Sequence, residues 1–125
     1  MHSGLKGLTV LLLEDESMVA MLTEDILLEQ GCDVLLAMRL EDGLKLARDA
    51  AFDLAVLDVN LGGGNTSYPV ADLLLERRIP FLFATGYHAG GMDPRFEECP
   101  KIQKPFTPTD LANRAWETIS SAHAA

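Results

Sequence analysis

The segment Leu54–Asp58 (LAVLD) most constrains the fold, because four consecutive apolar residues lead directly into a carboxylate. An unbroken apolar run is typical of a strand that is covered on both faces, and such strands occur in parallel sheets packed between helices. Asp58 is therefore predicted at the carboxyl end of a central strand. In open α/β sheets ligands bind at that edge, since the connecting loops leave in opposite directions and open a crevice.

Strand-like and helix-like segments alternate along the whole chain. The other predicted strands are Leu8–Leu13, Asp33–Ala37, Phe81–Ala84 and the more polar Lys101–Lys104, which we expect at an edge of the sheet. The predicted helices are Leu40–Ala50, Val70–Arg78, and two more that follow Ser17 and Thr107. Repeated β-then-α units imply right-handed crossovers and a three-layer α/β sandwich.

The first predicted helix has Ser17 as its cap and Gly31 as a left-handed stop. Its apolar residues Val19, Leu22 and Ile26 recur at helical spacing, which predicts a helix.

The last helix has a clear start, with Thr107 as cap, Pro108 at the first position and Asp110 three residues after the cap. By contrast, the stretch 88–100 holds Gly and Pro with little periodicity, so any fourth helix there is expected to be short or irregular.

Length and charge exclude several classes of protein. The 125 residues suffice for one domain with its own core, and we expect no effector domain beside it. Ten basic against nineteen acidic residues give a net charge of -9, which argues against a nucleic-acid partner. No apolar run reaches the ~20 residues of a membrane helix and no signal peptide is evident, so we expect a cytoplasmic protein with no membrane partner.

Four predicted strands end in polar side chains: Glu14-Asp15, Asp58, Thr85 and Lys104. Parallel strands lie ~4.8 Å apart, so these groups converge on one crevice if their strands are neighbours. Two carboxylates in close proximity repel each other unless a cation neutralises them, and their oxygens suit Mg²⁺. With the metal, Asp58 could attack phosphorus, while Lys104 and Thr85 contact the phosphoryl oxygens.

Four motifs, Leu12–Glu16 (LLEDE), Val56–Asp58 (VLD), Ala84–Gly86 (ATG) and Lys104–Phe106 (KPF), resemble in order and spacing the receiver domain of bacterial two-component response regulators. The resemblance implies a flavodoxin-like sheet of order 2-1-3-4-5 and a phosphoacceptor at Asp58. It also implies Mg²⁺ held by Asp15, Asp58 and the backbone carbonyl of Asn60, with Glu14 assisting through water. Thr85 would swing toward the phosphoryl group, and the Lys104-Pro105 peptide would be cis.

Two features depart from the usual receiver pattern. Lys101 occupies the position where receivers carry an aromatic switch residue, and Thr85 and Lys104 are only 19 residues apart, which fits a truncated fourth helix. The run Pro80–Tyr87 (PFLFATGY) resembles the atypical stand-alone "FATGUY" receivers. Tyr87 is one candidate to replace the missing aromatic residue.

The resemblance predicts a single-domain response regulator that takes a phosphoryl group from a sensor histidine kinase or a histidine phosphotransfer protein. It would phosphorylate and dephosphorylate itself without being an enzyme toward other substrates, and it would signal to a downstream protein or pass the phosphoryl group on. A rival prediction is a phosphorylation-independent interaction module. A Mg²⁺ phosphohydrolase is disfavoured, because Asn60 stands where its second acid would be.

Overall fold

Five parallel strands form the central sheet of the computed structural model, which describes residues 3–86 and 92–123. They are β1 (Thr9–Leu13), β2 (Asp33–Ala37), β3 (Leu54–Asp58), β4 (Phe81–Thr85) and β5 (Lys101–Gln103). Their order is β2-β1-β3-β4-β5 and every pairing is parallel. This confirms the predicted flavodoxin-like sheet, with β3 in its centre and β5 at an edge.

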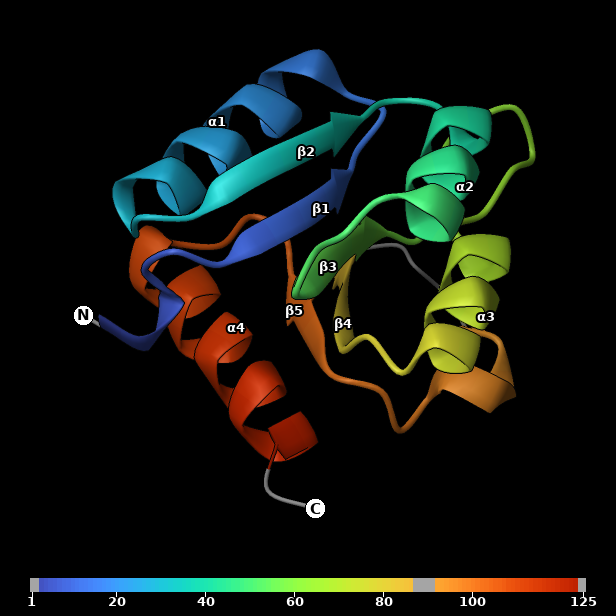
Figure 1. Cartoon of the computed structure of the whole chain (residues 1–125). Coiled ribbons are helices and arrows are strands. Elements are labelled where there is room, and N and C mark those ends of the chain that lie inside the picture. Colours follow the sequence, from blue (N-terminus) through green and yellow to red (C-terminus); the bar gives the residue numbers. More distant parts are fainter. Residues whose placement is uncertain (1–2, 87–91, 124–125) are drawn as a thin grey trace.

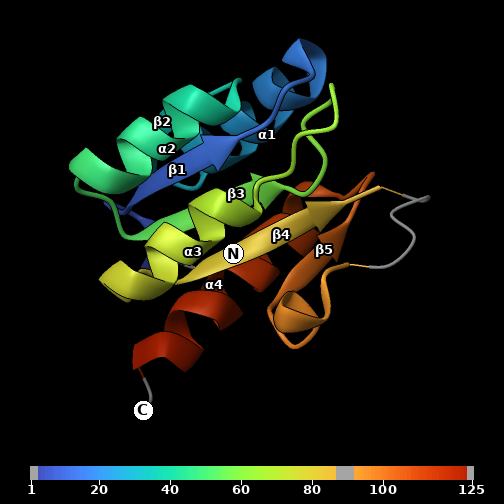
Figure 2. The same ribbon diagram turned by 90° about the vertical axis from the view of Figure 1, so that its right-hand side faces the viewer.

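Helices cover both faces of this sheet. They are α1 (Ser17–Glu29), α2 (Leu40–Asp49), α3 (Tyr68–Arg77) and α4 (Pro108–His123), with short 3-10 helices η1 (Ser3–Leu5) and η2 (Pro94–Phe96). Helices α1 and α4 lie on one face, and α2 and α3 lie on the other (Figures 1 and 2). None of the helices in the described ranges combines the length and apolar character needed to cross a bilayer.

The central strand explains the unbroken apolar run in the sequence. Leu54 and Val56 pack into the core under α1 and α4, whereas Ala55 and Leu57 pack into the core under α2 and α3. All residues of β3 are buried. Because successive side chains of a strand point to opposite faces, a strand covered on both sides must be apolar at every position.

The three apolar residues of α1 that recur at helical spacing differ in their surroundings. Ile26 packs against the core, whereas Leu22 is 60% exposed. The residues that the helix buries are Ala20, Thr23 and Leu27. The start is displaced by one residue: Ser17 is the first residue of the helix, with no side-chain cap. Gly31 does adopt the predicted left-handed conformation, with φ of 89°.

The start of α4 is confirmed. The Thr107 N–H donates to Asp110 Oδ2 at 3.2 Å, and the Asp110 N–H donates to Thr107 Oγ1 at 3.0 Å, so the two residues form a reciprocal cap. Between β4 and β5, the described residues contain one short 3-10 helix, η2, in agreement with a short or irregular fourth helix. Tyr87 lies outside the described residues.

Candidate functional site

Three acidic side chains meet at the carboxyl edge of the sheet. Glu14 and Asp15 follow β1, and Asp58 ends β3, the strand hydrogen-bonded to β1. Each contributes a carboxylate oxygen to a group whose members all lie within 4.8 Å of one another. Glu14 and Asp58 are buried, and Asp15 is partly exposed. The register of two neighbouring strands thus brings together the acids that the sequence predicted.

Lys104, which follows the edge strand β5, brings one positive charge to these acids. Its Nζ lies 2.9 Å from Glu14 Oε1 and 3.2 Å from Asp58 Oδ1. Its backbone N–H donates to the carbonyl of Thr85 at 2.7 Å, which fixes the residue beyond the end of β5. The Lys104-Pro105 peptide is cis, as the family resemblance implied.

The electrostatics of the site favour an additional cation. Burial and the charge of Glu14 raise the pKa of Asp58 to about 7, although Lys104 pulls it in the opposite direction. Burial lowers the pKa of Lys104, but its hydrogen bond to Glu14 and the charge of Asp58 outweigh that effect and raise it. Three carboxylates share one ammonium group, so the cluster carries an excess of negative charge.

The residues of the cluster fit a Mg²⁺ ion. Two buried carboxylates and one partly exposed one present oxygen ligands to a common point, and hard divalent cations prefer such oxygen ligands. The loop after β3 approaches Asp15. Asn60 forms an isolated antiparallel bridge with Thr66. Gly62 has φ of 77°, and a Cβ atom there would lie 3.3 Å from Asp15 Oδ2. The loop therefore packs directly against this carboxylate.

Thr85 lies at the same edge of the sheet but makes no recorded contact with the acidic cluster among the described residues. It ends β4, one residue beyond Ala84, whose register partner is Asp58. Its partly exposed side chain lines a polar cavity of about 760 Å³ between β5 and α4, together with Lys101 and Arg114. Thr85 thus lies at the same edge of the sheet as the acids and makes no hydrogen bond to them in the described part of the chain.

Sequence reasoning missed an apolar groove beside the site. Val19, Leu22 and Ile26 of α1 form one wall, and Phe106 and Lys104 stand opposite, around a cavity of about 350 Å³. The signal in the sequence was that α1 has more large apolar residues than a helix with a single buried face requires. They form an exposed set: Met18, Met21, Leu22 and Leu28.

Lys101, the residue in place of the usual aromatic, has a structural partner. Its Nζ donates to the backbone carbonyls of Glu97 and Cys99, at 3.2 Å in the second case. The side chain therefore fixes the chain between η2 and β5.

No family model and no curated protein matches the chain. Among solved structures, SdrG from Sphingomonas melonis Fr1 is 37% identical over 96% of this chain and 99% of its own, with a TM-score of 0.81. A response regulator receiver protein from Sinorhizobium medicae WSM419 is 22% identical over 94% of this chain and 98% of its own, with a TM-score of 0.80. A CheY-like receiver domain protein from Methanospirillum hungatei JF-1 is 20% identical over 95% and 98%, with a TM-score of 0.78.

The last two likenesses concern the fold, and SdrG extends the likeness to the sequence. All three share the overall fold of this chain, with TM-scores of 0.78 to 0.81. The chain belongs to the family of response regulator receiver domains.

Proposed function

We propose that this protein is a response regulator of a two-component phosphorelay, in which Asp58 accepts a phosphoryl group from a phosphohistidine. One observation carries the proposal: Asp58 is buried beside two other carboxylates and one lysine at the carboxyl edge of the sheet. A buried carboxylate surrounded in this way is costly unless the site serves a cation or a charged group.

Asp15 and Asp58, with Glu14 and the carbonyl of Asn60, are the residues that would hold Mg²⁺. When bound, the ion supplies positive charge that offsets the developing charge on the phosphoryl oxygens. The cluster of carboxylates supports this assignment, because Lys104 alone leaves it negatively charged.

In the proposed transfer, the Asp58 carboxylate oxygen forms a bond to phosphorus as the phosphorus–nitrogen bond of the phosphohistidine breaks. The electron pair of that bond returns to the imidazole nitrogen, and a ring that carries a proton on its other nitrogen leaves as neutral imidazole. Lys104 already lies 3.2 Å from Asp58 Oδ1, so its ammonium group can follow the charge onto the phosphoryl oxygens. The phosphoryl group would later be lost to water, also without a separate enzyme.

A protein donor, rather than a small molecule alone, is supported by the groove that adjoins Lys104. Its apolar wall on α1 opens beside Lys104, and α1 itself contains three acids and no Lys or Arg. An apolar groove on an acidic helix suits a helix of a sensor histidine kinase or histidine phosphotransfer protein whose apolar stripe is flanked by basic residues.

The test is intact-mass measurement after incubation with Mg²⁺ and acetyl phosphate. Wild type is expected to gain one phosphoryl group, whereas Asp58→Asn and wild type with a chelator are expected to gain none. Asp25→Asn, the same change at an exposed acid of α1, serves as the control and should label like wild type. Labelling of Asp58→Asn, or no labelling of the folded wild type, would count against the proposal.

A second candidate is an interaction module that works without phosphorylation. Lys101 stands where receivers carry an aromatic switch residue, and its ammonium group is engaged by backbone carbonyls, so it is not arranged as a switch. Binding of a downstream partner that is equal for wild type and Asp58→Asn, with and without acetyl phosphate, would favour this candidate.

A further inference from the structure

The sheet has two edge strands, β2 and β5, and they differ in how well they are protected against pairing with another chain. Strand β5 contains only three residues, begins with Lys101 and lies between Pro100 and Pro105. Short length, lysine and proline are the devices by which natural sheets block their edges. The edge of β5 is therefore a poor template for a further strand.

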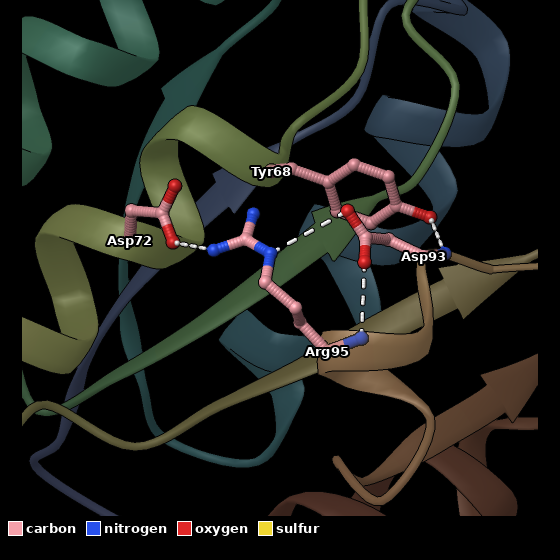
Figure 3. A network of polar contacts seen from close by, with 4 residues as sticks. All are labelled: Tyr68, Asp72, Asp93 and Arg95. Atoms are coloured by element: carbon pink, nitrogen blue, oxygen red, sulfur yellow. Dashed lines mark hydrogen bonds and ion pairs between the residues drawn. The ribbon is translucent and has the colours of Figure 1, made fainter.

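The chain that leads into β5 is also fastened in place. The Asp93 N–H donates to the hydroxyl of Tyr68 at 2.9 Å (Figure 3). The Arg95 guanidinium contacts Asp72 at 3.0 Å and Asp93 at 3.5 Å. Tyr68 also stacks on Phe96, with ring centroids 5.0 Å apart. Because Tyr68 and Asp72 belong to α3, these contacts hold η2 against α3 and fix the chain just before β5.

Strand β2 carries none of these protections. It spans Asp33–Ala37, pairs with β1 at every residue without a bulge, and contains no proline and no basic residue. Val34, Leu35 and Leu36 are all partly exposed, although each packs against the core. A regular, apolar edge strand of this kind is a template for another strand.

The backbone groups on the open side of β2 belong to two of its residues. The Ala37 carbonyl accepts from the N–H of Glu14 at 3.0 Å, so the backbone of Ala37 faces β1. Backbone groups of successive residues in a strand point to alternate sides, which directs those of Val34 and Leu36 away from β1. In the described part of the chain, no hydrogen bond reaches β2 from this outer side.

We propose that β2 pairs with β2 of a second copy of this chain, antiparallel and with a two-fold axis at Leu35, so that two sheets become one. In this register Val34 faces Leu36 of the second copy, and each residue donates to the other and accepts from it. All the outward backbone groups of both strands are then paired. The register is self-complementary, as a closed two-fold dimer requires.

The two ends of β2 complement each other in charge. Asp33 is exposed, and in the proposed register it faces Ala37 of the second copy rather than a second Asp33. Arg39 follows two residues after Ala37, at the end of the strand where Asp33 of the second copy arrives. Its side chain is 75% exposed and contacts only the exposed Glu41 among the described ion pairs, at 3.4 Å. Unlike charges near each other across two strands stabilise the pairing, whereas like charges directly opposite oppose it.

Helix α1 adds apolar surface beside the open edge. Met21 and Leu28 are exposed and do not line the groove described above. At about 100° per residue, Leu28 lies across the helix from Ile26, which lines the groove toward Phe106. Leu28 is therefore on the flank of α1 directed toward β2, the strand beside it in Figure 1. Pairing of the strands brings the two α1 helices near each other and removes apolar surface from water.

The net charge of -9 on each copy opposes this association. Salt screens such repulsion, so the dimer should strengthen as salt is added, whereas binding of a basic partner would weaken. Strand β1 separates β2 from β3, so the dimer leaves the acidic cluster at Asp58 uncovered. The proposal therefore does not depend on the proposed function.

Sedimentation velocity of the full chain over a range of concentrations tests the association. Wild type is expected to shift from monomer toward dimer, with an association constant that rises about threefold from about 0.05 M to about 0.5 M NaCl. Leu36→Lys places a charge on the open edge and should weaken association about tenfold or more. Leu73→Lys, the same change at a partly exposed leucine of α3, should stay within about twofold of wild type.

Leu35→Cys tests the register. At the two-fold axis the Cα atoms of the two substituted residues would lie ~4.5 Å apart, which is within the range of a disulfide. Mild oxidation should link Leu35→Cys into a covalent dimer. Val34→Cys should link far less, because in this register its two copies are not opposite each other. Wild type, with Cys32 and Cys99, gives the background.

Wild type that stays monomeric at every concentration and salt overturns the proposal, as does equal weakening by Leu36→Lys and Leu73→Lys. Equal cross-linking of Leu35→Cys and Val34→Cys overturns it too. If monomeric wild type instead binds an extended peptide of alternating valine and lysine, with slowed exchange of the Val34 and Leu36 amides, the edge belongs to a basic partner and the dimer is overturned. Should Leu36→Lys fail to fold, the cross-linking decides. Labelling of Asp58 by acetyl phosphate should be equal in wild type and Leu36→Lys, and its failure would concern the proposed function alone.

Discussion

Asp58→Asn is expected to stabilise the metal-free protein at pH 8. Burial and the charge of Glu14 raise the pKa of Asp58 from 3.8 to about 7, so ionising this group costs free energy in the folded state. At ~1.36 kcal/mol per pH unit, the difference sets a ceiling of about 4 kcal/mol. Relaxation of side chains and entry of water reduce such costs, and about 2 kcal/mol is expected. Asparagine keeps the shape and removes the charge, and Lys104 keeps its contact with Glu14.

The sign of the pH dependence follows from a carboxyl group whose pKa is higher in the folded state. Its contribution to stability is complete below about pH 4 and is lost as the pH rises through about 7. The advantage of Asp58→Asn over wild type should therefore grow from pH 4 to pH 7 and then level off. Excess Mg²⁺ should reverse the order at pH 8, because only wild type retains the full set of ligands.

Urea unfolding with a chelator, followed by far-UV circular dichroism at several pH values, measures this difference. Asp25→Asn makes the same chemical change at an exposed position of α1 and should stay within ~0.5 kcal/mol of wild type at every pH. An Asp58→Asn protein that is equally or less stable than wild type at pH 8 would refute the electrostatic reasoning.

Two further predictions concern the surroundings of the site. Gly62→Ala and Gly64→Ala both place a side chain at positive φ, 77° and 81°, and should lose similar stability, but only at Gly62 would the new Cβ press on Asp15. Calorimetry should therefore show weaker Mg²⁺ binding for Gly62→Ala alone; equal loss in both variants would contradict the contact. Leu22→Glu should slow phosphoryl transfer from a protein donor at least tenfold and leave labelling by acetyl phosphate unchanged. Leu75→Glu, at a similarly exposed leucine of α3, should affect neither rate, and equal slowing in the two variants would remove the role of the α1 groove.

The fold could be predicted from the sequence because its strongest signals are local. Strand β3 was predicted in full, since burial on both faces leaves an unbroken apolar run. The convergence of Glu14, Asp15, Asp58 and Lys104 could be predicted as well, because parallel strands place their ends at one edge. The cap of α4 needs only residues three apart.

The inner face of α1 could not be predicted, because apolar residues occur around most of that helix. Met18, Val19, Ala20, Met21 and Leu22 follow one another, so spacing alone does not select a face. Contact with the sheet decides in favour of the smallest of them, Ala20.

The contacts of Tyr68 were beyond sequence reasoning for a different reason. Its partner Asp93 lies 25 residues away, in the stretch 88–100, whose sequence has little periodicity that would indicate how the two approach.

Because helices cover both faces of the sheet, the protein has two separate surfaces on which partners could bind. The apolar groove lies on α1, whereas Tyr68 and Phe96 of η2 belong to the core under α2 and α3. Figure 1 shows α1 and α4 on one face of the sheet and α2 and α3 on the other. A phosphodonor protein bound at the groove of α1 would leave the face covered by α2 and α3 accessible to a downstream partner. Competition between these two partners would then require a conformational change transmitted through the sheet, because their binding surfaces do not overlap.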